Sequence, residues 1–265
     1  MNIVGELMKK AINLYFCAKR TDEKLRLIKN AGYDGVLLGV NETMTLAEQI
    51  ELMKKLGLEI SMIHCAYDES KLNYIWENGE IGDEVESDLL LQIEKIKDFG
   101  ENINFVIHTC GSKLCDTSEV GLSRIKRILN VCEKYNVNLC IENLYLASQV
   151  EYIFKNLKSK NLKFCYDSGH ENFLTPGERL ARKYSDLLAV THIHDNHGQT
   201  DEHMIIGNGT INQDELAEDL AKADCQFLTA EIKYFGKNDS AEKVLKDNLV
   251  ALNKLENKIN LHKEI

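Results

Sequence analysis

Short apolar segments alternate with longer amphipathic segments eight times along this sequence. In chain order the apolar segments read INLYF, DGVLLGV, EISMIHC, INFVIHT, VNLCIEN, LKFCYD, LAVTHIH and QFLTAEIKY. Such nearly continuous apolar runs are typical of parallel strands that are covered on both faces of a sheet. Eight strand–helix units in 265 residues predict an α/β fold, a (β/α)8 or TIM barrel, as one domain spanning residues 1–265.

The amphipathic segments carry helix start and stop signals. Thr21 and Thr45 open two of them as candidate N-caps, and Gly32 and Gly57 close the same two as candidate C-caps. A doubly wound open sheet would show a similar alternation and stays the alternative fold. No G-x-G-x-x-G motif follows the first apolar segment, however, which favours the barrel over a dinucleotide-binding sheet.

The composition indicates where in the cell the protein is found. The sequence has no apolar run of membrane-spanning length, and its first residues lack the order of a signal peptide. Its 8 cysteines form no C-x-x-C pair and lie mostly in or beside apolar runs, which indicates reduced, buried thiols. We therefore expect a cytoplasmic protein with no membrane association.

Ionisable residues interrupt six of the apolar segments near their C-terminal ends. They are His64, His108, Glu142, Asp167, the pair His192 and His194, and Glu231. In a barrel these ends converge on one bowl, where clustered carboxylates and imidazoles would repel one another or lose solvation. A divalent cation removes that cost, because such side chains are its usual ligands. Hydrogen bonds that neutralise the groups mutually are the alternative.

The segment THIHDNHGQTDEHMIIGNG, residues 191–209, holds four of the 8 histidines and raises the same question. It is either part of a metal site or a polar surface loop. His192 and His194 belong to the seventh apolar segment, whereas Asp201 and His203 follow it in the connection.

Four of these motifs resemble the xylose isomerase-like TIM barrel superfamily. That superfamily includes sugar and sugar-phosphate isomerases and epimerases, and the endonuclease IV-like enzymes of AP endonuclease family 2. The resemblance covers nearly the whole chain and rests on CIEN, CYDSGH, HIHDN and AEIKY. It implies a divalent metal ion, zinc or manganese, held by Glu142, Asp167, His192 and Glu231. An H-x-x-D pattern in the seventh strand selects His192 over His194, which would then contact substrate or pack.

Further motifs extend the resemblance to additional metal or substrate positions. HCAY supplies His64 and Tyr67, VIHTCGS supplies His108, and D-x-x-H supplies His170. D-x-H-x-x-x-G-x-G supplies Asp201 and His203. All nine positions that bind three zinc ions in the endonuclease IV family have matching residue types here, which implies that more than one ion is possible. Many isomerase-like members keep the same residues, so this match is specific for the superfamily only.

The resemblance also answers the question about residues 191–209. It implies the seventh strand followed by an active-site loop, in which Asp201 and His203 return toward the bowl. Gly207 and Gly209 would let the backbone turn beneath them. His197 is expected to face solvent.

The resemblance favours a metal-dependent isomerase or epimerase that acts on a small sugar or sugar phosphate. The metal would chelate neighbouring carbonyl and hydroxyl oxygens and stabilise an enediolate. Glu142 and Glu231, on strands three apart, would be the two catalytic groups, one removing a proton and the other returning it. Tyr67, His194 and Lys233 are the candidate substrate-binding residues.

Two other functions compete with this one. An endonuclease IV-like zinc phosphodiesterase would need basic loops around the bowl to hold DNA, but the net charge is -10 and the loops are mostly acidic. Nucleic acid is therefore the less favoured partner. A non-catalytic sugar-binding barrel would be expected to lack a catalytic carboxylate, yet Glu142 and Glu231 are both present. The identity of the sugar, the native metal and the oligomeric state stay open.

Overall fold

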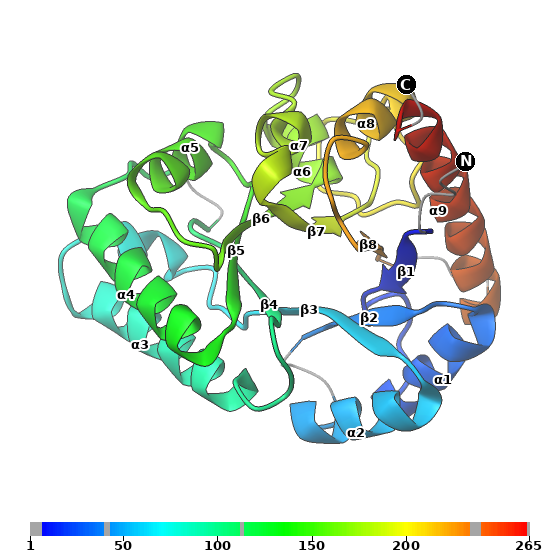
Figure 1. Ribbon diagram of the computed structural model, residues 1–265, viewed down its shortest axis with the longest axis horizontal. Coiled ribbons are helices and arrows are strands. Elements are labelled where there is room, and N and C mark those ends of the chain that lie inside the picture. The colour runs from blue at the N-terminus through cyan, green and yellow to red at the C-terminus, as the bar shows by residue number, and fades with distance from the viewer. Residues whose placement is uncertain (1–6, 40–42, 112–113, 234–239, 264–265) are drawn as a thin grey trace, which may run out of the picture.

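Eight parallel strands form a barrel surrounded by helices in the computed structural model of the protein (Figure 1). The structure describes residues 7–39, 43–111, 114–233 and 240–263. The eight strands are β1 (Lys9–Ile12), β2 (Gly35–Leu38), β3 (Glu59–His64), β4 (Asn104–Ile107), β5 (Asn138–Glu142), β6 (Leu162–Asp167), β7 (Leu188–His192) and β8 (Phe227–Ala230). Each pairs in parallel with its neighbour in the sequence from β1 to β7, and β1 also pairs with β8. The predicted TIM barrel is thus confirmed.

The helices lie outside the strands and follow them in chain order. They are α1 (Thr21–Ala31), α2 (Leu46–Leu56), α3 (Glu80–Ile96), α4 (Glu119–Tyr135), α5 (Ala147–Asn156), α6 (Ser168–Leu174), α7 (Leu180–Lys183), α8 (Gln213–Leu220) and α9 (Ala241–Lys263). Two short 3-10 helices, η1 (Leu72–Trp76) and η2 (Ser185–Leu187), lie in the connections. None of these described helices has the combination of length and apolar character that crossing a bilayer requires.

A backbone bridge just beyond β7 closes the ring. The Ile193 amide donates to the Thr229 carbonyl at 2.8 Å, and the Glu231 amide donates to the Ile193 carbonyl at 3.2 Å. The bridge therefore fixes Glu231 directly beside the segment that carries His192 and His194.

Two apolar layers hold the barrel together. The larger layer lies between the strands and the surrounding helices. The smaller one takes one side chain from each strand from β2 to β7, namely Leu37, Met62, Val106, Cys140, Cys165 and Val190. These side chains come from the strand positions that face the barrel interior, so the interior is a packed floor and not a pore.

The sequence placed the start of two elements wrongly. The first strand is Lys9–Ile12, so only Ile12 of the predicted segment INLYF belongs to it. Lys9 and Lys10 interrupt the apolar pattern, so the sequence did not indicate a strand here. Lys10 is nevertheless buried, and its ammonium group pairs with the Glu256 carboxylate at 2.8 Å. Thr21 is the first residue of α1 and not its N-cap, which is Arg20.

The other predicted helix signals are confirmed. Thr45 caps α2 in a capping box with Glu48, and Gly57 ends the helix in the left-handed conformation at a φ of 65°. Gly32 ends α1 in the same way at a φ of 97°.

Candidate active site

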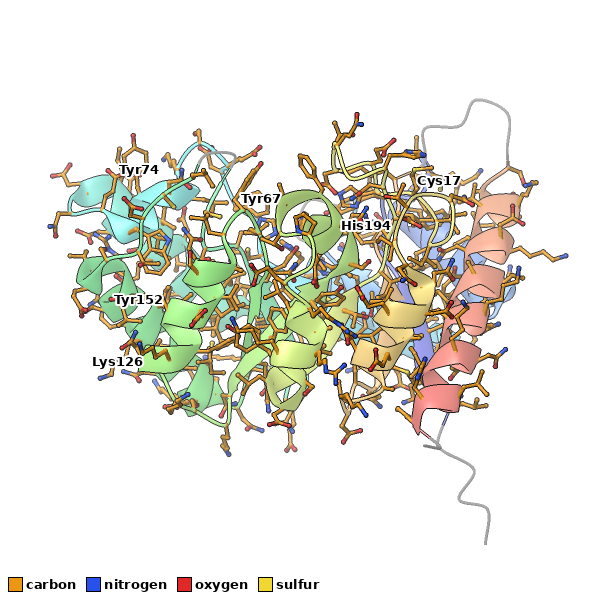
Figure 2. The ribbon with its side chains drawn as sticks, turned by 90° about the horizontal axis from the view of Figure 1, so that it is seen from above. Cys17, Tyr67, Tyr74, Lys126, Tyr152 and His194 are labelled. Atoms are coloured by element: carbon orange, nitrogen blue, oxygen red, sulfur yellow. The ribbon has the colours of Figure 1, made fainter. Side chains whose placement is uncertain are left out.

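The ionisable residues at the strand ends meet in a cavity of about 300 Å³ at the C-terminal side of the barrel. Figure 2 shows this side uppermost, with Cys17, Tyr67 and His194, which follow β1, β3 and β7, all in the upper half of the molecule. The residues that line the cavity are Tyr15, Gly39, His64, Cys65, Ala66, Tyr67, His108, Glu142, His170, Asp201, His203, Glu231 and Lys233.

His192 lies at the centre of three carboxylates. Its Nδ1 is 3.1 Å from Glu231 Oε2, 3.3 Å from Glu142 Oε1 and 3.6 Å from Asp167 Oδ2. The atom is buried but has no hydrogen-bond partner among the described residues. Four residues from β5, β6, β7 and the segment after β8 therefore point their donor atoms at a common space.

Two further histidines meet the other oxygen of Glu142. His108 Nε2 lies 3.1 Å and His64 Nε2 lies 3.3 Å from Glu142 Oε2, and the two nitrogens are 3.2 Å apart. His64 Nδ1 is 3.0 Å from the Cys65 carbonyl oxygen. A proton on Nδ1 would bond that carbonyl, so the neutral ring would direct its Nε2 lone pair into the cavity.

The loop after β7 returns two residues to the same place. His203 Nε2 lies 2.7 Å from Asp201 Oδ2, and His203 Nδ1 lies 3.0 Å from the Glu231 carbonyl oxygen. His203 has a φ of 50°, a conformation uncommon for a residue other than glycine. Its ring stacks on that of His194 at a centroid distance of 4.2 Å. Such local strain is found where the surrounding structure fixes a side chain, often at functional sites.

His170 and His194 complete the cluster on the β6 side. His170 Nδ1 is 3.1 Å from Glu142 Oε1, and His170 Nε2 is 3.8 Å from Asp201 Oδ2. His194 Nε2 is 3.0 Å from Asp167 Oδ1. Asp167 therefore contacts both histidines of the seventh strand segment, because its other oxygen faces His192.

The cluster is electrostatically coupled. Burial by itself would raise the pKa of Glu142, but His192 and His108 more than offset this and hold the pKa well below its usual range. Burial by itself would lower the pKa of His64, whereas its contacts with the Cys65 carbonyl and Glu142 raise the pKa to about 10. The carboxylates thus favour positive charge at their centre, whether it is supplied by protons or by a cation.

The residues fit a divalent ion. Carboxylate oxygens and imidazole nitrogens are the donors that zinc and manganese accept. Donor atoms that share an ion at about 2.0–2.2 Å are themselves separated by roughly 3–4 Å, and those around His192 Nδ1 lie 3.1–3.6 Å from it. His194 Nδ1 and Asp201 Oδ1 are also buried and have no hydrogen-bond partner within the described part of the chain. Buried polar atoms normally have partners, so these orphaned atoms support bound ions in this cluster.

The predicted site residues outside the cluster are placed as follows. The Tyr67 ring lies 4.5 Å from the His108 ring at the cavity wall, and Lys233 lines the same cavity. His197 does not reach the cavity: it is exposed and lies 2.9 Å from Glu202. The long connection after β3 contributes Tyr67, whereas its tryptophan, Trp76, is buried and donates to the Thr109 carbonyl at 2.6 Å.

Sequence reasoning missed several residues that support the cluster. Asn143 holds the Asp167 backbone from both sides, accepting from its amide at 2.7 Å and donating to its carbonyl at 2.9 Å. Met62 Sδ lies 3.1 Å from His192 Nε2. Gly169 allows α6 to approach β7, because a Cβ there would lie 1.9 Å from the His194 ring. Asn143 stands in the quoted motif CIEN and could have been suspected, but the other two needed the tertiary structure.

Asp195 organises the loop that carries Asp201 and His203. It accepts hydrogen bonds from the backbone amides of Gly207 at 2.8 Å and Ile211 at 3.1 Å. Gly207 has a φ of 95°, and a Cβ at Gly209 would lie 2.2 Å from the Asn196 carbonyl oxygen. The two glycines therefore permit the return of the loop, as the sequence predicted.

Comparison with known proteins gives a family match and partial relatives. A family model described as a xylose isomerase-like TIM barrel matches residues 25–255. Protein MJ1614 of Methanocaldococcus jannaschii is 37% identical over 99 residues, which are 35% of this chain and 38% of that protein. Protein y4fM of Sinorhizobium fredii is 32% identical over 97 residues, 34% of this chain and 31% of that protein. The chain thus matches about a third of the length of each of these relatives.

Solved structures share the fold over nearly the whole chain. An L-ribulose 3-epimerase superposes with a TM-score of 0.80 at 12% identity, covering 97% of both chains. A D-tagatose 3-epimerase-like protein gives 0.76 at 20% identity, covering 97% of this chain and 99% of that one. A 3-keto-D-glucoside 4-epimerase of E. coli gives 0.71 at 20% identity, covering 94% and 100%. At these identities the likeness concerns the fold.

Proposed function

The chain belongs to the xylose isomerase-like TIM barrel family, and we propose that it is a metal-dependent isomerase or epimerase of a small sugar. One observation carries the proposal: Glu142 and Glu231 approach the same buried His192 nitrogen, at 3.3 Å and 3.1 Å, from strand segments three apart around the barrel. The site would thus combine a cation position with two carboxylates that line one cavity and come from different strand segments. The structural neighbours include an L-ribulose 3-epimerase and a 3-keto-D-glucoside 4-epimerase, which agrees with this chemistry.

Glu142, Asp167, His192 and Glu231 would hold the ion, which we propose to be zinc or manganese. When bound, the ion would polarise the substrate carbonyl and stabilise the negative charge that develops on its oxygen. The groups around His64–His108–Glu142 and around His194–Asp201–His203 offer positions for further ions.

The two glutamates would perform the proton transfers. One carboxylate removes the proton from the carbon beside the carbonyl, which leaves an enediolate, and a proton then returns to carbon. If Glu142 and Glu231 face opposite sides of the sugar, return from the second carboxylate inverts the carbon. Return to the neighbouring carbon moves the carbonyl and gives an isomer.

The remaining residues would orient the substrate. Tyr67 and Lys233 line the cavity and would contact sugar hydroxyls. His194 is fully buried and contacts Asp167, so we assign it to orienting that carboxylate or to a further ion.

We also propose a cytoplasmic location, which fits the 8 cysteines because none of them forms a disulfide.

An endonuclease IV-like phosphodiesterase remains the second candidate, because one specific observation favours it. The nine positions that correspond to its metal ligands do converge here, including His170, Asp201 and His203. The acidic balance of the chain disfavours it, since DNA binding depends on cationic contacts with phosphates.

The test of the main proposal is proton exchange. The metal-loaded protein is incubated with a panel of ketoses and ketose phosphates in deuterated water and followed by NMR. We expect isomerisation or epimerisation with deuterium at the reacting carbon. Turnover without deuterium would contradict enediolate chemistry and favour a hydride shift.

Substitution of the two glutamates completes that test. Glu142→Gln and Glu231→Gln keep the side-chain shape but remove the base, so each should lower turnover by about 10²–10⁴-fold. Because each change also removes a charged ligand position, metal content is measured in every sample. Near-native turnover by either variant would exclude that glutamate from proton transfer. No turnover by the metal-loaded native protein, together with no nuclease activity, would favour the non-catalytic barrel.

A further inference from the structure

A second, smaller cavity of about 120 Å³ adjoins the active-site cavity, and four residues line both: Tyr67, His108, His170 and Asp201. We call this second cavity the side lobe. Its other walls come from the connections after β3, β4 and β5 and from α6, and they are Glu69, Leu72, Cys110, Gly111, Leu144, Tyr145, Phe173 and Leu174. The proposed function does not use this space.

The side lobe has a different chemistry from the bowl beside it. Leu72 and Leu144 are buried in its wall, and Tyr145 and Phe173 are half-buried. Its lining includes the acids Glu69 and Asp201 and the two histidines that it shares with the bowl, and none of its described lining residues is a lysine or arginine. The described part of the wall thus offers no lysine or arginine to a phosphate or carboxylate, and it suits a neutral group with an apolar face.

The side lobe lies next to one particular wall of the active-site cavity. Tyr15 and Lys233 line the active-site cavity but not the side lobe, so the two cavities adjoin on the side of His108 and His170. Tyr67 stands at the junction, with its ring 4.5 Å from the His108 ring and 44% of its surface exposed. A molecule that reacts between Glu142 and Glu231 and is longer than one sugar ring would reach the lobe past Tyr67.

We propose that the side lobe is a subsite for a neutral group joined to the reacting sugar by a glycosidic bond, such as a second sugar ring or an aryl group. The inference rests on the proposed function and narrows its substrate. A glycosidic bond blocks the anomeric carbon, so the carbonyl that acidifies the exchanging proton must lie at another ring carbon. The substrate class is therefore a ketoglycoside rather than a free ketose or a sugar phosphate.

The aromatic residues supply the affinity in this subsite. Tyr67, Tyr145 and Phe173 are the aromatic residues, other than histidine, that line the lobe. Aromatic side chains bury a large area and pack well against flat apolar faces. Phe173 lies in α6 three residues after His170 and is not itself a proposed ligand, so its substitution changes the lobe without removing a donor atom.

Calorimetry with two matched probes tests the subsite. The manganese-loaded full chain is titrated with methyl and with phenyl 3-keto-β-D-glucopyranoside, which differ only in the glycosidic group. Burial of the phenyl ring should tighten binding by roughly tenfold relative to methyl. Phe173→Ala should bring the ratio of the two affinities close to one. Tyr145→Ser serves as a second lobe variant in case the first does not fold.

Tyr74→Ala is the control, because Tyr74 is an exposed tyrosine of the same face that lines neither cavity. The Tyr74→Ala variant should still bind the phenyl glycoside more tightly than the methyl glycoside. Tyr74 is labelled in Figure 2. Equal affinities for the two glycosides in the native protein, or tighter binding of D-fructose 6-phosphate than of either, would overturn the subsite and leave the proposed function standing. If ketoglycosides and free ketoses all fail to bind and to exchange deuterium, the proposed function falls and the subsite with it.

Discussion

Met62 shows how much a single side chain contributes to this site. Its sulfur lies 3.1 Å from His192 Nε2 in the buried floor of the barrel. A thioether accepts hydrogen bonds but does not donate them, so the contact favours a proton on Nε2. The Nδ1 lone pair then faces Glu142, Asp167 and Glu231. Groups that orient a metal-binding histidine in this way are commonly worth 10–100-fold in metal affinity, by order of magnitude.

We therefore predict that Met62→Leu weakens metal binding without unfolding the protein. The two side chains have similar volume, so the free energy of unfolding should change by less than about 1.5 kcal/mol. The dissociation constant for manganese, measured by chelator competition, should rise by roughly tenfold or more. Leu37→Met, in the same interior layer, is the matched control. Unchanged metal affinity in Met62→Leu would show that the contact only packs.

Gly169 gives a second prediction at this scale. A Cβ at this position would lie 1.9 Å from His194 Cε1, so Gly169→Ala must displace the His194 ring or α6. Overpacking of this kind costs about 1–3 kcal/mol of unfolding free energy. Gly100→Ala is the control, since its nearest neighbour would be 3.8 Å away. Urea unfolding of the two variants should separate them clearly, and equal stability would mean that the helix shifts without cost.

Some residues of the site could be predicted from the sequence, whereas Met62 and Gly169 could not. Glu142 and Asp167 end apolar strands with a charge, which is so costly when unpaired that the pattern alone suggests a site. Met62 and Gly169 raise no such question, because a methionine in a strand and a glycine beside one are ordinary core residues. Met62 matters through its 3.1 Å contact with His192, and Gly169 matters because a Cβ there would collide with the His194 ring. Both partners lie far along the chain, so no local pattern predicts them.

At the scale of elements, the connection after β3 depends on one residue of another helix. Arg124 of α4 is buried, and its guanidinium donates to the carbonyls of Tyr74 at 3.2 Å and Ile75 at 2.9 Å. It also bonds the Asp83 carboxylate at 2.8 Å. The arginine thereby ties η1 and α3 to α4 and fixes the loop that places Tyr67 at the cavity.

Arg124→Lys should loosen this connection. A lysine keeps the charge but lacks the planar fork of donors, so it leaves buried carbonyls unsatisfied at a cost of about 1–3 kcal/mol. We expect faster amide hydrogen exchange in residues 71–79, with strands β5 to β7 unaffected. Lys126→Ala is the control, because Lys126 is an exposed residue of the same helix (Figure 2). Equal exchange in both variants would assign the loop's order to other contacts.

Element boundaries were predictable only where the signal was local. Thr45 and Glu48 form a capping box within one turn, and the sequence identified that start correctly. β1 was misplaced because the partner of Lys10 is Glu256 in α9, at the other end of the chain. A buried lysine looks like a solvent-facing one until its distant partner is known.

For the whole molecule, the barrel topology decides which residues meet. Glu142, Asp167, His192 and Glu231 are far apart in the sequence and come together because parallel strands share one carboxyl end. The sequence could therefore predict the bowl once it predicted the barrel. It could not choose between a sugar and a phosphodiester, because both chemistries use the same donor atoms.

Net charge separates those two chemistries, and it supplies the last prediction. A DNA-cleaving enzyme gains affinity by releasing counterions from phosphates, which requires several lysines or arginines at the binding face. The chain has a net charge of -10, and the described residues that line the active-site cavity include a single cation other than histidine, Lys233. We thus expect little or no incision of an abasic duplex near physiological salt, with zinc or manganese present.

The assay needs a control for contaminating nucleases, which are active in trace amounts. Glu142→Gln, purified in parallel, provides it, because genuine incision by this chain must fall with the loss of that carboxylate. Lowering the salt concentration strengthens any weak electrostatic binding and so gives the nuclease its best opportunity. Metal-dependent incision that survives at physiological salt and disappears in Glu142→Gln would make DNA the substrate. It would also mean that the nine convergent positions outweigh the acidic surface, and that the cavity beside Tyr67 receives a deoxyribose phosphate instead of a sugar.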